Sequence, residues 1–191
     1  MELMAALPPE SVSAIVCDPP YGLKFMSKDF DNLGDGRAQQ AWHLRWCEQA
    51  FRVLLPGGHL LAFGGSRTSH HLACAVEDAG FEIRDSIIFL YGVGFPKSKN
   101  LGGGWGTNLK PAHEPIVVAR KPISERTIAA NAIKHSTGGL NIDGCRIEGA
   151  CNDDMHKKNP HTKGGFGHGE ATVYGKSRGA DTYDPTKGRW P

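Results

Sequence analysis

The chain has 191 residues, a formal net charge of +2 and 39% hydrophobic residues, which is enough for one domain with a sizeable core. No run of 18 apolar residues occurs, which excludes a membrane-spanning helix, and no signal-peptide pattern opens the chain, so we expect a cytoplasmic protein. The five cysteines are scattered without a CxxC pair, so we expect no metal site and no disulfide framework.

The first structural signal is an apolar run at residues 12–16, which follows a short helical pattern at 1–7. This run predicts a strand buried on both faces, as in a parallel sheet. The two prolines at 19–20 cannot continue a central strand, so the chain must leave the sheet at Asp18. Asp18 and Tyr21 are therefore placed at the C-terminal end of a strand, where open α/β sheets bind their ligands.

This turn suits the recognition of a nucleobase. The Asp18 carboxylate and the Pro19 carbonyl are both acceptors, and an exocyclic amino group has two N–H donors to offer them. The Tyr21 ring can stack on a planar heterocycle, an interaction worth roughly 1–3 kcal/mol per base. Together these groups favour a binding site for a base that has been rotated out of a duplex.

A polar connection follows at 22–37, which is either a loop over a ligand site or an ordinary linker. The segments after it alternate between helical and strand patterns. The alternation predicts a doubly wound α/β sheet, with the last two strands as an antiparallel edge pair. The predicted elements are a helix at 38–55 stopped by the sequence Pro56-Gly57-Gly58, a strand at 59–63, a helix capped by Ser66 and ended by Gly80, a strand at 81–91, a glycine-rich loop at 92–110 and a strand at 113–120.

The tetrapeptide Asp18-Pro19-Pro20-Tyr21 resembles the DPPY motif of amino-group DNA methyltransferases. Those enzymes transfer a methyl group from S-adenosylmethionine to adenine N6 or cytosine N4. The segments LLPGGHLLAFGG, DAGFEIRDSIIFLYGVGFPKS and LKPAHEPIVVARKP follow in the order of the class in which DPPY comes first. The resemblance covers residues 12–122 and implies a Rossmann-like methyltransferase sheet.

The resemblance also implies the cofactor, the partner and the site. S-adenosylmethionine is the expected cofactor and double-stranded DNA the expected partner. The implied catalytic residues are Asp18, Pro19, Pro20 and Tyr21, with Asp18 also at the cofactor. Candidates for contact with the target base are Phe95, Lys97 and His113.

One departure from the family pattern concerns the C-terminal part. In this class a glycine-rich cofactor loop of the FxGxG type follows the target-recognition region, and no such loop occurs after residue 122. Residues 123–191 are glycine-rich and show little periodicity. We therefore expect 1–122 to be the catalytic half of the domain and 123–191 to be the start of an incomplete, loop-rich target-recognition region. About three central strands and most of the cofactor pocket would then be missing.

Loss of those strands has a physical consequence for the strand at 12–16. It would become an exposed apolar edge, and such edges pair with other chains or aggregate. We therefore expect marginal stability, and either self-association or a complementing chain at this edge.

The functional hypothesis is an amino-group DNA methyltransferase with adenine N6 favoured over cytosine N4. Two alternatives stay open. One is a non-catalytic DNA-binding remnant of such an enzyme, consistent with the absent glycine loop. The other is a methyltransferase acting on RNA or on a protein amide, because related enzymes use NPPY-type turns for those substrates.

Overall fold

The computed structural model describes residues 2–24, 28–94 and 98–145. The chain divides into two compact units, Met1–Gly139 and Leu140–Pro191. In the second unit the described residues form a single short 3-10 turn, η3 (Asp143–Cys145). The fold that positions the candidate site lies in the first unit.

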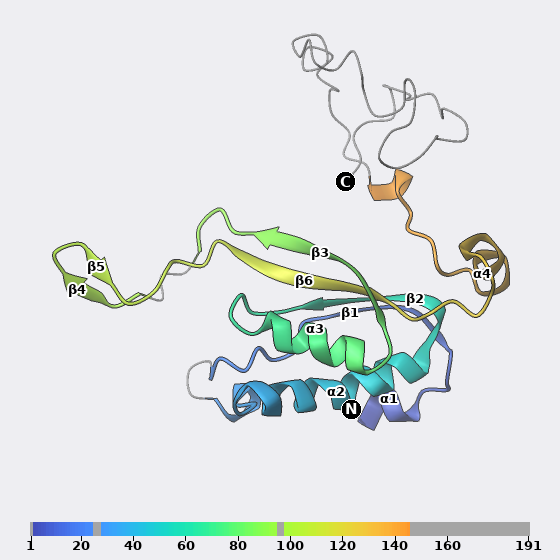
Figure 1. Cartoon of the computed structure of the whole chain (residues 1–191), viewed down its shortest axis with the longest axis horizontal. Helices are drawn as coiled ribbons and strands as arrows, with labels where there is room; N and C mark the ends of the chain where they lie inside the picture. Colours follow the sequence, from blue (N-terminus) through green and yellow to red (C-terminus); the bar gives the residue numbers. More distant parts are fainter. Residues whose placement is uncertain (1, 25–27, 95–97, 146–191) are drawn as a thin grey trace, which may run out of the picture. The chain divides into compact units, whose positions relative to one another are not determined.

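The first unit has a mixed α/β order (Figure 1). In sequence, its elements are α1 (Glu2–Ala6), β1 (Val12–Cys17), the 3-10 turn η2 (Asp29–Asp31), α2 (Gly36–Val53), β2 (Leu54–Phe63), α3 (Ser69–Asp78), β3 (Glu82–Leu90), β4 (Asn100–Gly102), β5 (Trp105–Gly106), β6 (His113–Arg120) and α4 (Ile128–His135).

The main sheet has four strands in the order β1-β2-β6-β3. The β1 and β2 strands are parallel, with Ile15 beside Leu60. The β6 strand is antiparallel to both of its neighbours, with Val117 beside Ala62 on one side and Ser86 on the other. The expected α/β sheet and the antiparallel pairing of its last two strands are therefore confirmed.

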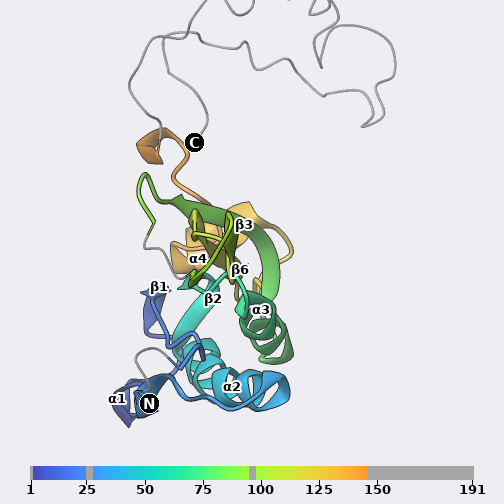
Figure 2. The same ribbon diagram turned by 90° about the vertical axis from the view of Figure 1, so that its left-hand side faces the viewer.

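The hydrophobic core lies between this sheet and the helices α2 and α3. In Figure 2 both helices lie on the same side of the sheet. One cluster of buried side chains joins them, because Cys47 from α2, Val76 from α3 and Leu60 from β2 are all inaccessible to solvent. The apolar spacing of the two helical segments thus produces one helical layer that packs against one face of the sheet.

The prediction that the first strand is buried on both faces is wrong for this chain. The β1 strand lies at one edge of the sheet and has β2 as its neighbour. Val16 keeps 69% of its surface exposed, although its sequence is that of a central strand. The apolar edge that we expected here is present in the first unit.

Two predicted helix ends also differ from the structure. Helix α2 ends at Val53, because β2 begins at once at Leu54. The Pro-Gly-Gly segment lies within β2, where the pairing register with β1 shifts between Val12 and Ala14. Ser66 does not cap the next helix, which begins at Ser69.

Helix α4 was not anticipated from the sequence, and it connects the segment after residue 122 to the sheet. Asn131 is completely buried, and its side-chain amide donates to the carbonyl of Pro56 (2.9 Å) and to that of Thr137 (3.1 Å). Its side-chain oxygen accepts from the backbone N–H of Ser124 (3.0 Å). The compact unit therefore continues past the 122 boundary, to Gly139.

The glycine-rich connection at 92–110 contains the short hairpin of β4 and β5, which we had also not predicted. None of the helices in the described part of the chain has the length and apolar character needed to cross a membrane.

Candidate active site

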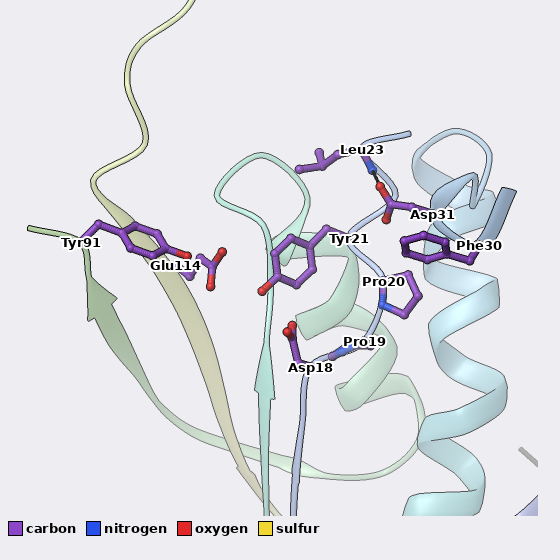
Figure 3. A pocket seen from close by; sticks show the side chains of 9 residues that line it. All are labelled: Asp18, Pro19, Pro20, Tyr21, Leu23, Phe30, Asp31, Tyr91 and Glu114. Carbon is purple, nitrogen blue, oxygen red and sulfur yellow. Dashed lines mark hydrogen bonds between the residues drawn. The ribbon is translucent and has the colours of Figure 1, made fainter. Parts of the chain in front are cut away.

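A cavity of about 640 Å³ opens at the end of the sheet where β1 and β3 finish and β6 begins (Figure 3). The residues that line it come from four separate parts of the chain. They are Asp18, Pro19, Pro20, Tyr21, Leu23, Phe30, Asp31, Tyr91 and Glu114.

The turn after β1 places the predicted tetrapeptide on the cavity wall. The strand ends at Cys17, and the two prolines that follow have no N–H with which to extend the pairing. The backbone carbonyl of Tyr21 accepts a hydrogen bond of 2.7 Å from the Thr68 hydroxyl. Thr68 precedes α3, so the turn is tied to the helix layer beneath the sheet.

Gly65 allows this close approach. A Cβ atom at residue 65 would lie 3.3 Å from both the Tyr21 Cβ and the Leu23 Cδ1, which is tighter than ordinary packing. The glycine pair that follows β2 therefore makes room for the cavity wall.

The chain after Tyr21 is held in place by Asp31. Its carboxylate accepts hydrogen bonds from the backbone N–H groups of Gly22 (2.7 Å) and Leu23 (3.0 Å), and its residue surface is only 3% exposed. Gly22 has φ +69°, and a side chain there would collide with the amide group of Gln39. That amide donates to the Gly22 carbonyl (3.0 Å), so a conformation that favours glycine is fixed from both sides.

Two tyrosines and two carboxylates form a cluster across the cavity, as Figure 3 shows. Burial and the hydrogen bonds of its hydroxyl with Asp18 and Glu114 raise the pKa of Tyr21 far above its ordinary value. A hydrogen bond to Glu114 raises the pKa of Tyr91 to about 12, with smaller contributions from burial and from the charges of Glu114 and Asp18. Both phenols therefore remain protonated donors at neutral pH.

The acid at the strand end also affects the neighbouring thiol. Burial, and then the negative charge of Asp18, raise the pKa of Cys17 to about 11. Cys17 is therefore a protonated thiol at neutral pH, which argues against a nucleophilic role for it.

The cavity offers acceptors to a ligand. The two carboxylate oxygens of Asp18 can accept further hydrogen bonds besides the one from the Tyr21 hydroxyl. Within the described part of the chain, no hydrogen bond ends on the carbonyl of Pro19. Among the described residues, the lining side chains include three carboxylates and no lysine, arginine or histidine. Such a site can bind N–H donors or a cation next to an aromatic surface.

The structure brings the four residues of the tetrapeptide together in this cavity. His113 lines an adjacent cavity rather than this one. Phe95 and Lys97 lie outside the described residues. A catalytic role for any of these residues stays a prediction.

Three lining residues that sequence reasoning had not selected are Asp31, Tyr91 and Glu114. A usable signal existed for two of them. Tyr91 lies at the end of one strand of the predicted antiparallel pair, and Glu114 lies near the start of the other. Both residues are therefore expected at the same end of the sheet. Asp31 gave no such signal, because it stands in a polar connection.

The chain is similar to known proteins over most of its length. Residues 12–159 match the N6/N4 methyltransferase family that is described as DNA methylase. The type II methyltransferase M.HindIII of Haemophilus influenzae is 30% identical over an alignment of 119 residues that covers 53% of this chain and 38% of that protein. The type II methyltransferase M.HpaI of Haemophilus parainfluenzae is 27% identical over 129 residues, 65% of this chain and 37% of that protein.

Among solved structures, the cytosine-N4-specific PvuII DNA methyltransferase superposes with a TM-score of 0.50 and 19% sequence identity, covering 67% of this chain and 50% of that one. This similarity concerns the fold, which is the Rossmann-like fold of the DNA methyltransferases. The chain spans little more than a third of the length of the two curated relatives. Because the family match extends over most of the chain and includes the whole candidate site, the protein belongs to the N6/N4 DNA methylase family.

Proposed function

We propose that the chain is the catalytic half of an S-adenosylmethionine-dependent DNA methyltransferase that modifies an exocyclic amino group, adenine N6 in preference to cytosine N4. One observation carries this proposal. The Asp18 carboxylate, the unengaged Pro19 carbonyl and the Tyr21 ring line one cavity at the end of β1. Two acceptors beside an aromatic ring match a planar base with an amino group.

In the proposed mechanism the target base leaves the duplex and stacks against Tyr21. Asp18 and the Pro19 carbonyl each accept one N–H of its amino group, which orients the nitrogen lone pair away from the ring plane. The prolines keep the two acceptors in a fixed relation, so the protein contributes positioning rather than a covalent intermediate. The raised pKa of Cys17 agrees with a mechanism that uses no thiolate.

The residues present also fit the proposed cofactor. S-adenosylmethionine, when bound, supplies an electrophilic methyl group on a positively charged sulfonium. Within the part of the chain that the structure describes, the cavity presents the carboxylates of Asp18, Asp31 and Glu114 and no basic side chain, which favours a cation. Since Asp31 is engaged by two backbone N–H groups, Asp18 and Glu114 are the carboxylates that we assign to the charged ligand.

The test is methyl transfer by the intact chain from isotopically labelled S-adenosylmethionine to duplexes that contain only adenine or only cytosine as acceptor. Asp18→Ala should reduce turnover by at least about 100-fold, because the amino group loses one of its two positioning acceptors. Asp29→Ala is the matched control, since Asp29 is exposed and does not line the cavity. Near-normal methylation by Asp18→Ala would contradict the mechanism.

The same assay separates the alternatives. Methyl incorporation into RNA or protein but not DNA would reassign the substrate. DNA binding without cofactor binding, measured by calorimetric titration of the folded chain with S-adenosylmethionine, would indicate a non-catalytic remnant.

A further inference from the structure

A second cavity, of about 590 Å³, lies beside the candidate active site. Leu23 lines both cavities, so the two are neighbours that share one side chain as a wall. The second cavity is bounded by the loop between β2 and α3, which contributes Ser66 and Arg67, and by the segment that leads into β6, which contributes Lys110 and His113. Nothing in the catalytic proposal uses Arg67 or Lys110.

The two cavities have opposite charge. Among the described residues, the charged side chains of the first are Asp18, Asp31 and Glu114, all acidic. The described wall of the second has Arg67, Lys110 and His113 and no carboxylate. Neither Arg67 nor Lys110 takes part in an ion pair among the residues that the structure describes, so both cations are available to a ligand.

The wall between the cavities is held in position. Leu23 is fixed by the hydrogen bond from its backbone N–H to Asp31 (3.0 Å) and packs over Gly65, the residue immediately before Ser66. A nucleotide has the same division of chemistry, with an amino-bearing base at one end and an anionic phosphate at the other. The two cavities match this division, with acceptors beside an aromatic ring in the first and positive charge in the second, and Leu23 between them.

We propose that this second cavity binds a phosphodiester group of the DNA strand adjacent to the nucleotide whose base enters the first cavity. Arg67 and Lys110 provide the positive charge from two separate segments of the chain, and His113 and the Ser66 hydroxyl provide hydrogen bonds. The proposal rests on the proposed function for its choice of ligand. Its own prediction concerns phosphate binding and its salt dependence, which are measured without any methyl transfer.

The experiment is a fluorescence anisotropy titration of a labelled duplex with one mismatched adenine, against the intact chain and its Arg67→Ala, Lys110→Ala and Arg126→Ala variants. Arg126 is the matched control, because it is an exposed arginine that does not line either cavity. The salt slope is the steepness with which log K for DNA binding falls with log salt concentration, and loss of one phosphate contact should lower it by about one. The ratio of the affinity of the unmodified chain to that of Arg67→Ala or Lys110→Ala should therefore shrink by about 3.5-fold between about 50 and about 200 mM salt. The Arg126→Ala curve should match the unmodified chain.

A second measurement changes the DNA at single phosphates. Duplexes with a neutral methylphosphonate at single positions beside the mismatched adenine should weaken binding at one or two positions, and this loss should be absent in Lys110→Ala. If the chain binds DNA but all three variants share its salt slope, the phosphate site is refuted while the proposed function stands. If the chain binds no DNA at low salt, both are contradicted. Competition by free AMP or inorganic phosphate as strong as that by DNA would show a free-phosphate site and refute the DNA assignment.

Discussion

The Asp31 carboxylate accepts a hydrogen bond of 2.7 Å from the backbone N–H of Gly22. A second bond, of 3.0 Å, comes from Leu23, so one buried acid fixes two consecutive peptide groups directly after Tyr21. Bonds from N–H groups to an ionised acceptor are stronger than neutral ones. The shape of the candidate active site therefore depends on a cavity-lining residue that lies outside the Asp18–Tyr21 tetrapeptide.

Replacement of Asp31 by alanine should release this connection and leave two N–H groups without their acceptor. We expect a loss of about 2 kcal/mol in the free energy of unfolding, together with faster hydrogen exchange at the amides of Gly22 and Leu23. Asp29→Ala, on the exposed side of the same η2 turn, is the control and should leave both quantities unchanged. Equal exchange rates in the two variants would show that Asp31 does not hold the turn.

The substitution Glu114→Gln should lower the pKa of Tyr91 from about 12 toward the ordinary value of 10. The reason is that the main cause of the raised pKa is the hydrogen bond to the Glu114 carboxylate, which also adds a negative charge nearby. Carbon-13 NMR of the tyrosine ring carbons measures this titration directly. Glu48→Gln, at an exposed site on α2, should leave the Tyr91 pKa as it is.

The stability of the fold should fall as the pH drops from about 6.5 to about 4, and His43 should account for part of the loss. Burial, and then the charge of His71, lower the pKa of His43 from 6.5 to about 4, and its Nδ1 accepts a bond of 3.1 Å from the Trp46 indole. In that range the unfolded chain binds a proton at His43 and the folded chain does not. Each pH unit should cost up to about 1.4 kcal/mol.

Thermal unfolding of His43→Gln between pH 7 and pH 4 should accordingly show a shallower fall than that of the unmodified chain. Parallel curves for His43→Gln and the unmodified chain would mean that His43 is protonated equally in both states.

Asn131→Ala should destabilise the first unit by about 2–3 kcal/mol, because the Ser124 N–H loses its acceptor and the carbonyls of Pro56 and Thr137 each lose one donor. The control is Lys134→Ala on the same helix, which breaks an exposed ion pair with Glu125 and should have little effect. Denaturant titration measures both. A loss as small as that of the control would show that α4 contributes nothing to the sheet's stability.

The β1 edge should make the chain self-associate, or bind a complementing chain, since Val16 is 69% exposed on a strand with an open side. Sedimentation velocity should show concentration-dependent association that Val16→Lys reduces. Val93→Lys is the control, because Val93 is 85% exposed but lies in a loop. A monomer at all concentrations, with a sharp thermal transition, would contradict this expectation.

Local patterns predicted the strands well where apolar residues and turn residues agreed. The strand at His113–Arg120 has the predicted bounds, and Gly80 ends α3 with φ +97° as expected of a helix-terminating glycine. Burial was harder to predict, because it depends on neighbouring strands. The sequence of β1 is apolar enough for a central position, yet the strand lies at an edge of this sheet.

The polar contacts could not be read from the sequence, because they join residues that are far apart in the chain. Thr68 donates a hydrogen bond to the Tyr21 carbonyl, and Asn131 donates one to the Pro56 carbonyl. The partners are so far apart in the sequence that no local pattern of residues indicates these contacts. Helix α4 has only eight residues, and a polar side chain lies at its buried position, so its apolar pattern is weak. The tetrapeptide could be located in advance, whereas the side chains that hold it in place could not.

The strand order has a consequence for synthesis on the ribosome. In the described sheet β3 pairs with β6 alone, and β6 is made after it. At roughly 5–20 residues per second, residues 91–120 take about 2–6 s to be translated and longer to leave the exit tunnel. During that interval the nascent β3 segment, with Ile87, Ile88, Phe89 and Leu90, has no strand to pair with. Exposed apolar segments of this kind promote aggregation, so we expect the yield of folded protein in a cell to depend on chaperone protection during this interval.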